Sequence, residues 1–348
     1  MSGSSCDGLD ICLSKFSNYG RKWHYEIKAA DTIPFSSEMA NRLLGAGSLN
    51  LPELVRLDKE FGTWCGNRIN DFLKNQSALP DFISSHGHTV FHRPDLGLTL
   101  QIGSGMEIGQ VTGLPVVADF RFEDVNQGGQ GAPLVPVGEK ELFPGYDGFL
   151  NLGGIANITL HDPGGQIRAF DICPFNQAGN YLSSRAGLSY DHDGALGKKG
   201  KLIPGIFESL SAHPWFSIQS PKSLGREWIV QEYLPVFDQS PGKPENLLFT
   251  HYELSAHLIA EAIGAGKKKI LVSGGGGKNT FFMEMLRRKT ECDLVRAESA
   301  VEDFKEALIF GFLGVLRITN RINVYAKITG GKEDLSAGTI YFEERLKV

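Results

Sequence analysis

The sequence predicts a two-domain α/β protein, and three observations lead to this fold class. The chain has 348 residues, which is more than one hydrophobic core usually serves. Apolar runs rich in strand-forming residues alternate with segments whose apolar residues recur at helical spacing. The 42 glycines gather in a few short loops, as expected of loops that contact a ligand.

Composition and charge exclude several classes of partner. A formal net charge of −5 gives no reason to expect nucleic acid or an anionic membrane. The N-terminus lacks a signal peptide, and no apolar run approaches the length of a membrane span. The five scattered cysteines form no C-x-x-C pair, so we expect neither a disulfide framework nor a zinc site. A cytoplasmic protein with a small-molecule substrate is predicted, with a homodimer left open.

The N-terminal run SGSSCDGLD predicts a polar loop followed by a strand. Ser2, Gly3, Ser4 and Ser5 precede an Asp7-Gly8 pair, which predicts a tight hairpin turn. Hydroxyl and N–H groups at such a turn suit polyphosphate oxygens, and Asp7 or Asp10 could hold a hydrated magnesium ion or a nucleophile. The alternative is a polar terminus with no ligand. Only Met1 precedes the loop, so no strand is expected to lead into it.

Two helices and a histidine-rich hairpin are expected next. Apolar residues recur at helical spacing over 36–77, with Ser37 and Asn50 as N-caps, and these helices serve packing. The run 81–94 reads as strand, turn and strand, which would place His86 and His88 on one face. No carboxylate or cysteine follows at ligand spacing, so hydrogen bonds to a polar ligand are favoured over a metal site.

A cluster of charges follows the apolar strand expected at 115–120. Asp119, Arg121 and Asp124 lie where that strand ends, and ligand sites of α/β proteins collect at such ends. These charged residues either form salt bridges with one another or bind a sugar or a carboxylate, in which case Arg121 is the binding group.

The stretch 151–180 carries the strongest candidate for catalysis. The turn at Gly153–Gly154 brings backbone N–H groups together and can cradle a phosphate, with Asn157 close behind it. Asp171 stands where the next apolar run gives way to a polar turn, so its carboxylate could act as a general base. The alternative is an ordinary hairpin followed by a solvated aspartate.

A second glycine loop and a closing helix complete the pattern. SGGGGKN lies between a strand and a helix but is no P-loop, because Val272 and Asn279 replace the required Gly and Ser/Thr. Such a loop can still admit an adenine ring or a phosphate. In the helix expected at 298–318, Gly311 and Gly314 would allow close packing, and Glu306 could bind a ligand hydroxyl. Residues 202–247 support no assignment.

The order of these loops resembles the actin-like ATPase superfamily, in which two ribonuclease H-like α/β domains hold ATP in a cleft between them. A closer resemblance covers nearly the whole chain, to the anhydro-N-acetylmuramic acid kinase family. It is carried by SGSSCDGLD, SHGHTVFHRP, VVADFRFEDVNQGGQGAPLVP, NLGGIANIT, AFDICPFN, SGGGGKN and EALIFGFLG. The resemblance implies an N-terminal domain of residues 1–144 plus 315–348 and a C-terminal domain of residues 145–314.

The resemblance implies ATP- and Mg²⁺-dependent conversion of 1,6-anhydro-N-acetylmuramic acid to N-acetylmuramic acid 6-phosphate, in bacterial peptidoglycan recycling. Asp171 would be the catalytic base. The residues implied to bind the ATP phosphates are Ser2, Gly3, Ser4, Ser5, Asp7, Gly8, Gly153, Gly154 and Asn157. Those implied for adenosine are Gly274, Gly275, Gly276 and Asn279, and those for the sugar are His86, His88, Arg121, Asn176 and Glu306. Magnesium would be held through the phosphates.

The chain departs from the family pattern at three places. DICPFN stands for DTGPGN, so Cys173 and Phe175 occupy small positions, and HGHT stands for HGQT. The strand before the first phosphate loop is also missing. Two other functions therefore stay open: another actin-like sugar kinase acting on an ordinary hydroxyl, and a catalytically weak ATP-gated binding protein.

Overall fold

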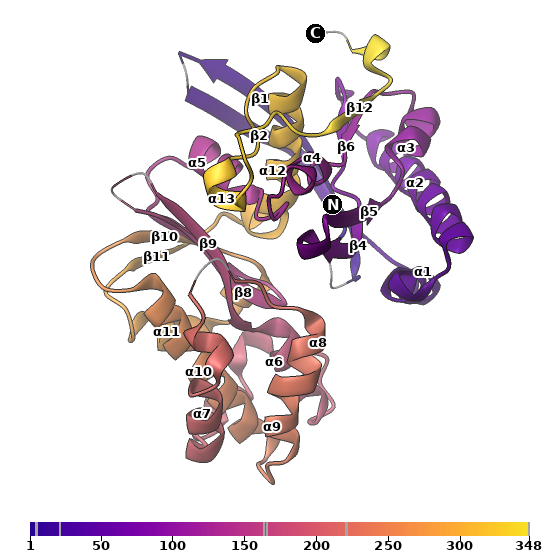
Figure 1. The fold of residues 1–348 in the computed structure, drawn as a ribbon. Coiled ribbons are helices and arrows are strands. Elements are labelled where there is room, and N and C mark those ends of the chain that lie inside the picture. Colours follow the sequence, from indigo (N-terminus) through magenta and orange to yellow (C-terminus); the bar gives the residue numbers. More distant parts are fainter. Residues whose placement is uncertain (4–5, 21, 163, 165, 220–221, 347–348) are drawn as a thin grey trace. The chain divides into compact units, whose positions relative to one another are not determined.

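The computed structural model describes residues 1–3, 6–20, 22–162, 164, 166–219 and 222–346. The chain divides into two compact α/β units, Met1–Pro144 with Phe304–Val348, and Gly145–Asp303 (Figure 1). The predicted fold class, two α/β domains, is confirmed. Residues 304–314, expected in the second domain, lie in the first unit, because helix α12 (Ser299–Ile318) passes from one unit to the other at a non-helical Phe304.

The second unit is built on one mixed five-stranded sheet. Its strand order is β11-β10-β7-β8-β9, with β7 parallel to β10 and antiparallel to β8. Numbered along the unit, this order is 5-4-1-2-3. The strands are β7 (Gly148–Leu152), β8 (Ile155–His161), β9 (Ile167–Pro174), β10 (Lys269–Ser273) and β11 (Asp293–Arg296).

Helices contribute most of the rest of the second unit's core. Buried side chains of β7 and β8 share one apolar cluster with those of the long helix α10 (Pro244–Ile263). Two further helices join it, α6 (Asn176–Ser184) and α11 (Thr280–Arg287). The stretch 202–247, which the sequence left unassigned, forms the short helices α7 (Pro204–Ser211), α8 (Arg226–Trp228) and α9 (Leu234–Asp238). Its aromatic residues are explained by packing, since Tyr233 and Phe237 are fully buried in this core.

The first unit divides its strands among three small sheets. Strands β1 (Gly8–Tyr19) and β2 (Lys22–Pro34) form a long antiparallel hairpin, of which the sequence predicted most of β1, residues 9–16, but not β2. Strand β6 (Val116–Ala118) lies between β3 (Ile83–Ser84) and β12 (Thr339–Tyr341). Strand β4 (His88–Arg93) pairs with β5 (Leu98–Ile102). The helices are α1 (Ser37–Leu44), α2 (Leu51–Leu73), α3 (Gly105–Thr112), α4 (Phe122–Asn126), α5 (Val135–Leu142) and α13 (Ala326–Thr329).

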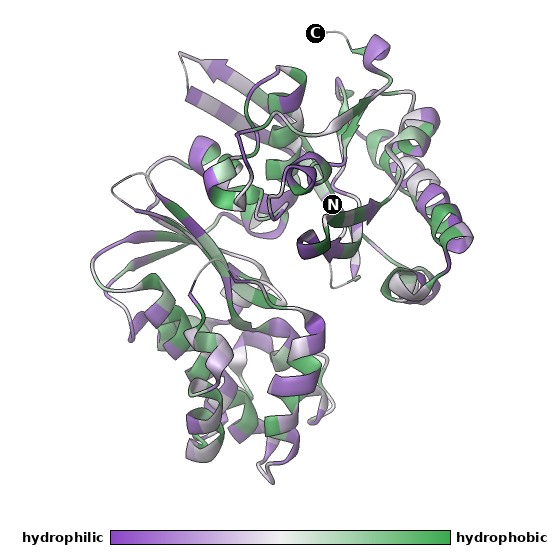
Figure 2. Ribbon diagram, viewed as in Figure 1, coloured by the Kyte–Doolittle hydropathy of each residue, from purple (hydrophilic) through white to green (hydrophobic). Residues whose placement is uncertain are grey.

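The predicted N-caps of the first two helices differ in outcome. Asn50 caps α2 as expected, in a capping box that its side chain and Glu53 form reciprocally. The cap of α1 is Ser36 and not Ser37, because Ser36 Oγ accepts the Met39 N–H and Ser37 is already helical. In Figure 2 the ribbon of α2 carries both green and purple residues, as expected of a helix with one buried face. Among the described residues, no helix has the length and apolar character needed to span a membrane.

The chain reverses before β1, but not through a tight Asp7-Gly8 turn. Ser2 forms an isolated antiparallel bridge with Leu9, and the Asp10 N–H donates to Met1 O over 2.9 Å. Gly8 is already the first residue of β1, and a Cβ there would lie 2.7 Å from Ile33 O. The predicted hairpin position is therefore wrong, although the reversal exists. Ser4 and Ser5 lie outside the described residues.

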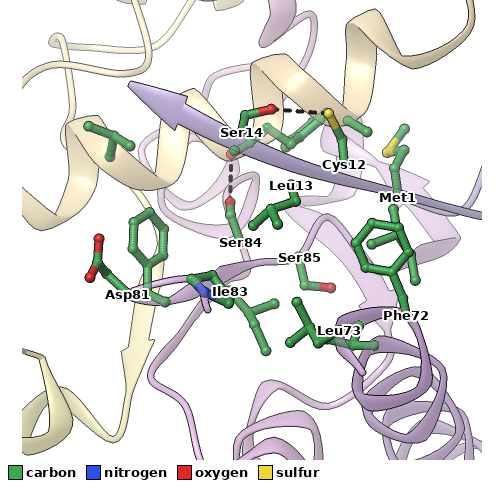
Figure 3. Close-up of a pocket in the computed structure, with 18 of the residues that line it drawn as sticks. Met1, Cys12, Leu13, Ser14, Phe72, Leu73, Asp81, Ile83, Ser84 and Ser85 are labelled. Carbon is green, nitrogen blue, oxygen red and sulfur yellow. Dashed lines mark hydrogen bonds between the residues drawn. The ribbon is translucent and has the colours of Figure 1, made fainter. Parts of the chain in front are cut away.

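A cavity of about 530 Å³ lies inside the first unit. Strand β1 borders one side and the segment Ile83–Ser85 another, while α12 contributes Phe310 and Gly311. Figure 3 shows Leu13 between the β1 ribbon and that segment. The hydroxyl of Ser84 donates to the Phe310 carbonyl, which ties the segment to α12.

The two glycines of α12 should respond oppositely to alanine. A Cβ on Gly311 would lie 3.6 Å from the Phe16 ring, which is ordinary contact, and Gly311 borders the cavity. Gly311→Ala is therefore expected to raise the free energy of unfolding by about 1 kcal/mol, the difference in helix propensity. A Cβ on Gly314 would lie 2.7 Å from Phe82 and 2.8 Å from Ser84, so Gly314→Ala should destabilise. Denaturant unfolding of both variants checks this, and equal effects would contradict it.

Candidate active site

A β-bulge places the Asp171 carboxylate. In the β8–β9 ladder Asn157 lies opposite Asp171 and Ala156 opposite Cys173, so Ile172 is an extra residue. Ala156 and Asn157 are neighbours on β8 and point to opposite faces of the sheet. Asp171 therefore shares a face with Asn157, whereas Cys173 points into the core. Without the bulge, Asp171 and Cys173 would share one face.

One oxygen of Asp171 is fixed by a segment that the sequence had left unassigned. The Leu224 N–H and the Ser223 hydroxyl donate to Oδ2 over 2.8 and 3.1 Å, and the Asp171 N–H donates to Lys222 O. No donor among the described residues is bonded to Oδ1. Burial raises the pKa of Asp171, and the two hydrogen bonds oppose this by favouring the charged form. The carboxylate is thus oriented, and its basicity is raised.

The hydrogen bond from Ser223 should influence the pKa of Asp171. Ser223→Ala removes a hydrogen bond to the charged form, so the pKa of Asp171 should rise further. The acidic limb of kcat/KM should then move to higher pH, with a roughly 3- to 10-fold loss near neutrality, since the Leu224 N–H remains. Ser211→Ala is the control, because that hydroxyl bonds only Glu208 O on an exposed helix. A limb at the wild-type position would contradict the prediction.

The Gly153–Gly154 turn joins β7 to β8 and abuts the start of α6. The N–H groups of Phe175 and Asn176 donate to the carbonyls of Gly154 and Gly153 over 2.9 and 3.1 Å. The Asn176 amide donates to Leu152 O over 3.0 Å. The turn carbonyls are therefore directed at the helix terminus, and Asn176 ties the turn to the residues after Asp171.

The SGGGGKN loop meets the same corner of the sheet. Gly274 has a φ of +84°, and a Cβ there would lie 2.6 Å from the Asn151 amide oxygen. The Asn176 amide lies 3.9 Å from the Cβ position of Gly275. The predicted residues Gly153, Gly154, Asn176, Gly274 and Gly275 thus form one group at the ends of β7 and β10. Asn279 is the N-cap of α11, its side chain accepting the Phe282 N–H over 3.0 Å.

Core packing accounts for the two bulky residues of DICPFN. Cys173 has no exposed surface, and burial raises its pKa. The Phe175 ring lies 4.5 Å from the Phe282 ring, and its Cε1 lies only 2.3 Å from where a Cβ on Gly276 would be. Gly276 therefore makes room for Phe175, and this pairing was not visible in the sequence.

In the first unit, Arg121 binds His86 and a loop carbonyl. Arg121 Nε donates to His86 Nε2 over 3.0 Å, and Nη1 donates to Gly131 O over 2.7 Å. Burial, with the nearby guanidinium, lowers the pKa of His86 well below its usual value, so this imidazole is neutral. Burial also lowers the pKa of Arg121 to about 10, partly opposed by Glu306. Arg121 makes no ion pair with a described residue, which disfavours the salt-bridged cluster.

The His88 side chain contacts a different residue, Ser2. Its Nδ1 lies 3.1 Å from Ser2 Oγ, and its pKa is lowered by burial. The expectation that His86 and His88 share a strand face is wrong, because β4 begins at His88 and Gly87 has a φ of +72°. Ser2 and His88 are nonetheless brought together, and so are His86 and Arg121.

The two aspartates beside Arg121 organise the loop. Asp124 is fully buried and accepts hydrogen bonds from the Gly131 N–H and the Thr329 hydroxyl. Asp119 accepts a hydrogen bond from the Tyr341 hydroxyl. Both are therefore engaged in structural contacts.

Glu306 lies on α12 among several charged groups. Burial raises its pKa, while Lys305 and Arg121 lower it and Asp10 and Glu139 raise it. Lys305 and Glu139 form a buried ion pair of 2.7 Å, 5% and 2% exposed, which the sequence analysis missed. Burial also lowers the pKa of the Met1 amino group, which donates to Asp10 O over 2.9 Å. Glu306 and Arg121 thus share an environment where a polar ligand could be held.

The carboxylates near the N-terminus are the groups that could reach a magnesium ion. Within the described part of the chain, no three His, Cys, Asp or Glu side chains cluster as a metal site. Magnesium commonly binds through one or two carboxylates, waters and substrate phosphates, so such a cluster is not required of it. Asp10 accepts a hydrogen bond from the Thr32 hydroxyl over 2.6 Å, and Asp7 precedes β1 directly.

A carboxylate oriented at a bulge in β9, in the same α/β unit as two glycine turns, is an arrangement typical of a phosphotransferase. Comparison with known proteins identifies the family to which the chain belongs. The family model described as anhydro-N-acetylmuramic acid kinase matches residues 1–343, and the chain belongs to this family.

Individual relatives agree. The chain is 33% identical to an anhydro-N-acetylmuramic acid kinase of Bordetella parapertussis, with 98% of this chain and 94% of that protein covered. It is 37% identical to one of Methylorubrum populi, over 78% of this chain and 74% of that protein. Among solved structures, component A of (R)-2-hydroxyglutaryl-CoA dehydratase from Acidaminococcus fermentans is similar at 12% identity and a TM-score of 0.43, covering 86% of this chain and 95% of that one. At that score the similarity supports no inference.

Proposed function

We propose that this enzyme uses ATP and water to convert 1,6-anhydro-N-acetylmuramic acid to N-acetylmuramic acid 6-phosphate. The observation that carries the proposal is the Asp171 carboxylate, with Oδ2 fixed and its pKa raised, in a member of this kinase family. In this role the enzyme would act in bacterial peptidoglycan recycling.

The reaction needs one strong base. Asp171 takes a proton from water, whose oxygen forms a bond to the anomeric carbon as the bond from that carbon to O6 breaks. O6 receives the γ-phosphoryl group, and the bond between that group and ADP breaks. Glycoside hydrolysis by inversion ordinarily uses a second carboxyl group to protonate the leaving oxygen. Capture of O6 by the phosphoryl group removes that need, so one carboxylate suffices.

The glycine turns are assigned to the nucleotide. Backbone N–H groups of the Gly153–Gly154 turn, with Asn157 beside Asp171, would bind phosphate oxygens. The predicted residues Ser2, Gly3 and Gly8, with Asp7 nearby, are likewise proposed for phosphate, and Gly274 to Gly276 would admit the adenosine. A magnesium ion bound to the phosphates would neutralise charge that develops in transfer, with Asp7 or Asp10 reaching it through water.

Arg121 and Glu306 are assigned to the sugar. The guanidinium keeps Nη2 without a partner among the described residues, so it can bind the lactyl carboxylate or a ring oxygen. Glu306, whose pKa is raised by burial, can accept from a hydroxyl or donate to one. His86 orients Arg121, and His88 and Asn176 would add hydrogen bonds.

Isotope labelling tests the ring-opening step. In ¹⁸O-labelled water, one solvent oxygen should appear on the anomeric carbon of the phosphorylated product within a single turnover, before solution exchange. Product without the label would show phosphorylation of an ordinary hydroxyl and would exclude the proposal. Free, unphosphorylated N-acetylmuramic acid as a major product would show that hydrolysis and transfer are not coupled.

A further inference from the structure

Two fully buried polar side chains of the second unit have no part in the proposed reaction. Tyr233 Oη lies 2.9 Å from His251 Nδ1, and His251 Nε2 lies 3.1 Å from the Phe175 carbonyl oxygen. Neither residue has exposed surface. Because a carbonyl can only accept, Nε2 must carry the proton, and Nδ1 must therefore accept from the tyrosine hydroxyl. The geometry fixes one tautomer and one direction for the chain Tyr233, His251, Phe175.

This series of hydrogen bonds ends at Phe175, a residue that contacts three parts of the site. Phe175 follows Asp171 by four positions, directly after β9. Its N–H donates to the carbonyl of Gly154, in the turn assigned to phosphate. Its ring packs on Gly276, in the loop assigned to adenosine. Its carbonyl accepts hydrogen bonds from His251 Nε2 over 3.1 Å and from the Gly179 N–H of α6 over 2.8 Å. A displacement of Phe175 would therefore move Asp171 relative to both glycine turns.

We propose that His251, oriented by Tyr233, is a positioning residue that fixes the Phe175 carbonyl and thereby places Asp171 against the Gly153–Gly154 turn. This proposal rests on the proposed function. It assigns a role to helix α10, which supplies no atom to the reaction.

The hydrogen bonds of Tyr233 and His251 are independent of pH near neutrality. Burial lowers the pKa of His251 to about 4, opposed only by its bond to Phe175 O. Burial raises the pKa of Tyr233 well above its usual value. Both groups are thus neutral near pH 7, and the bonds between them do not change with pH in the working range.

The test uses a double variant chosen to preserve the fold. Replacing both members of a buried polar pair by apolar residues of similar shape can be nearly neutral for stability. Tyr233→Phe with His251→Leu should therefore retain the melting temperature more closely than His251→Leu alone, while it removes the hydrogen bond from His251 and leaves the Phe175 carbonyl with the Gly179 N–H of its own helix. A displacement near 1 Å can cost about 10²-fold. We expect kcat to fall roughly 10- to 100-fold, with KM for both substrates within about 3-fold.

Two further variants separate positioning from packing. His251→Gln retains an N–H donor and should recover most of the lost kcat. Thr250→Val is the matched control, because Thr250 is buried on the same helix and its Oγ1 accepts the Ile203 N–H, away from Phe175. It should lower stability without lowering kcat. An unchanged kcat in the double variant, or an equal fall in Thr250→Val, would overturn the proposal.

A readout without substrate distinguishes this proposal from the proposed function. Amide hydrogen exchange of the peptide that contains 171–177 should accelerate at least 10-fold in the double variant and not in Thr250→Val. If the wild-type protein does not turn over the anhydro sugar, the proposed function fails, and hydrogen exchange alone then decides whether His251 holds Phe175. Unchanged hydrogen exchange in that peptide would refute the proposal that His251 fixes Phe175.

Discussion

Asp171→Asn is expected to lower turnover by about 10²- to 10⁴-fold, the range for loss of a general base. Asparagine keeps the size of the side chain and can still accept the hydrogen bonds from Ser223 and Leu224 through its amide oxygen. The sugar and ATP should therefore still bind, with dissociation constants within a few-fold of wild type. Calorimetric titration and steady-state kinetics on one preparation measure both quantities.

The same hairpin offers a matched control for this variant. Asp162 pairs with Arg168 at the surface, so Asp162→Asn removes a carboxylate without touching the site. It should leave turnover unchanged. Near wild-type turnover in Asp171→Asn would show that another group is the base. In wild type, kcat/KM should fall as the pH drops through the raised pKa of Asp171, which lies above the usual value for aspartate.

Gly276→Ala is expected to have the largest effect on stability. The new Cβ would lie 2.3 Å from Phe175 Cε1, and the buried ring is closed in by Phe282 and His251. Overpacking of this kind costs about 1–3 kcal/mol. Denaturant unfolding should show this as a lower midpoint with an unchanged slope.

Its neighbour provides the control. The nearest atom to a Cβ on Gly275 lies at 3.9 Å, so Gly275→Ala should leave stability within about 0.5 kcal/mol of wild type. Adding Phe175→Leu to Gly276→Ala should recover part of the loss, because the smaller side chain makes room. Additive effects of the two substitutions would contradict the contact.

Local signals in the sequence predicted much of the fold and singled out several residues that the structure brings together. Asn50 with Glu53 located a helix start, and NLGGIAN located a turn between two strands, because capping and turn chemistry are decided by a few neighbouring residues. The placement of Gly153 beside Asn176 and Gly275 depends on the order of strands in the sheet, which no local signal predicts. The roles assigned to individual site residues stay predictions.

The parts that were missed depend on contacts distant in sequence. Ser223 and Leu224 hold Asp171 across about fifty residues, and no spacing rule connects them. The bulky side chain of Phe175 has no explanation in the neighbouring sequence, because Gly276, which makes room for it, lies about a hundred positions away in the chain. The hairpin position at Gly8 was wrong because Asp-Gly is a turn signal in isolation, whereas here the pairing of Ser2 with Leu9 decides the reversal.

The extra residue in β9 has a consequence for how this strand can change. Because Ile172 is an extra residue, Asp171 and Cys173 lie on different faces, and only the cysteine is constrained by the volume of the core. Residue 173 can therefore be varied among small apolar side chains without altering the chemistry. Deleting Ile172 would make Asp171 and Cys173 direct neighbours, which point to opposite faces of a regular strand, so each would keep the face it has now. Loss of the bulge with Ile172 retained would instead put the acid and the cysteine on one face, either turning the cysteine outward or forcing a carboxylate into the apolar interior.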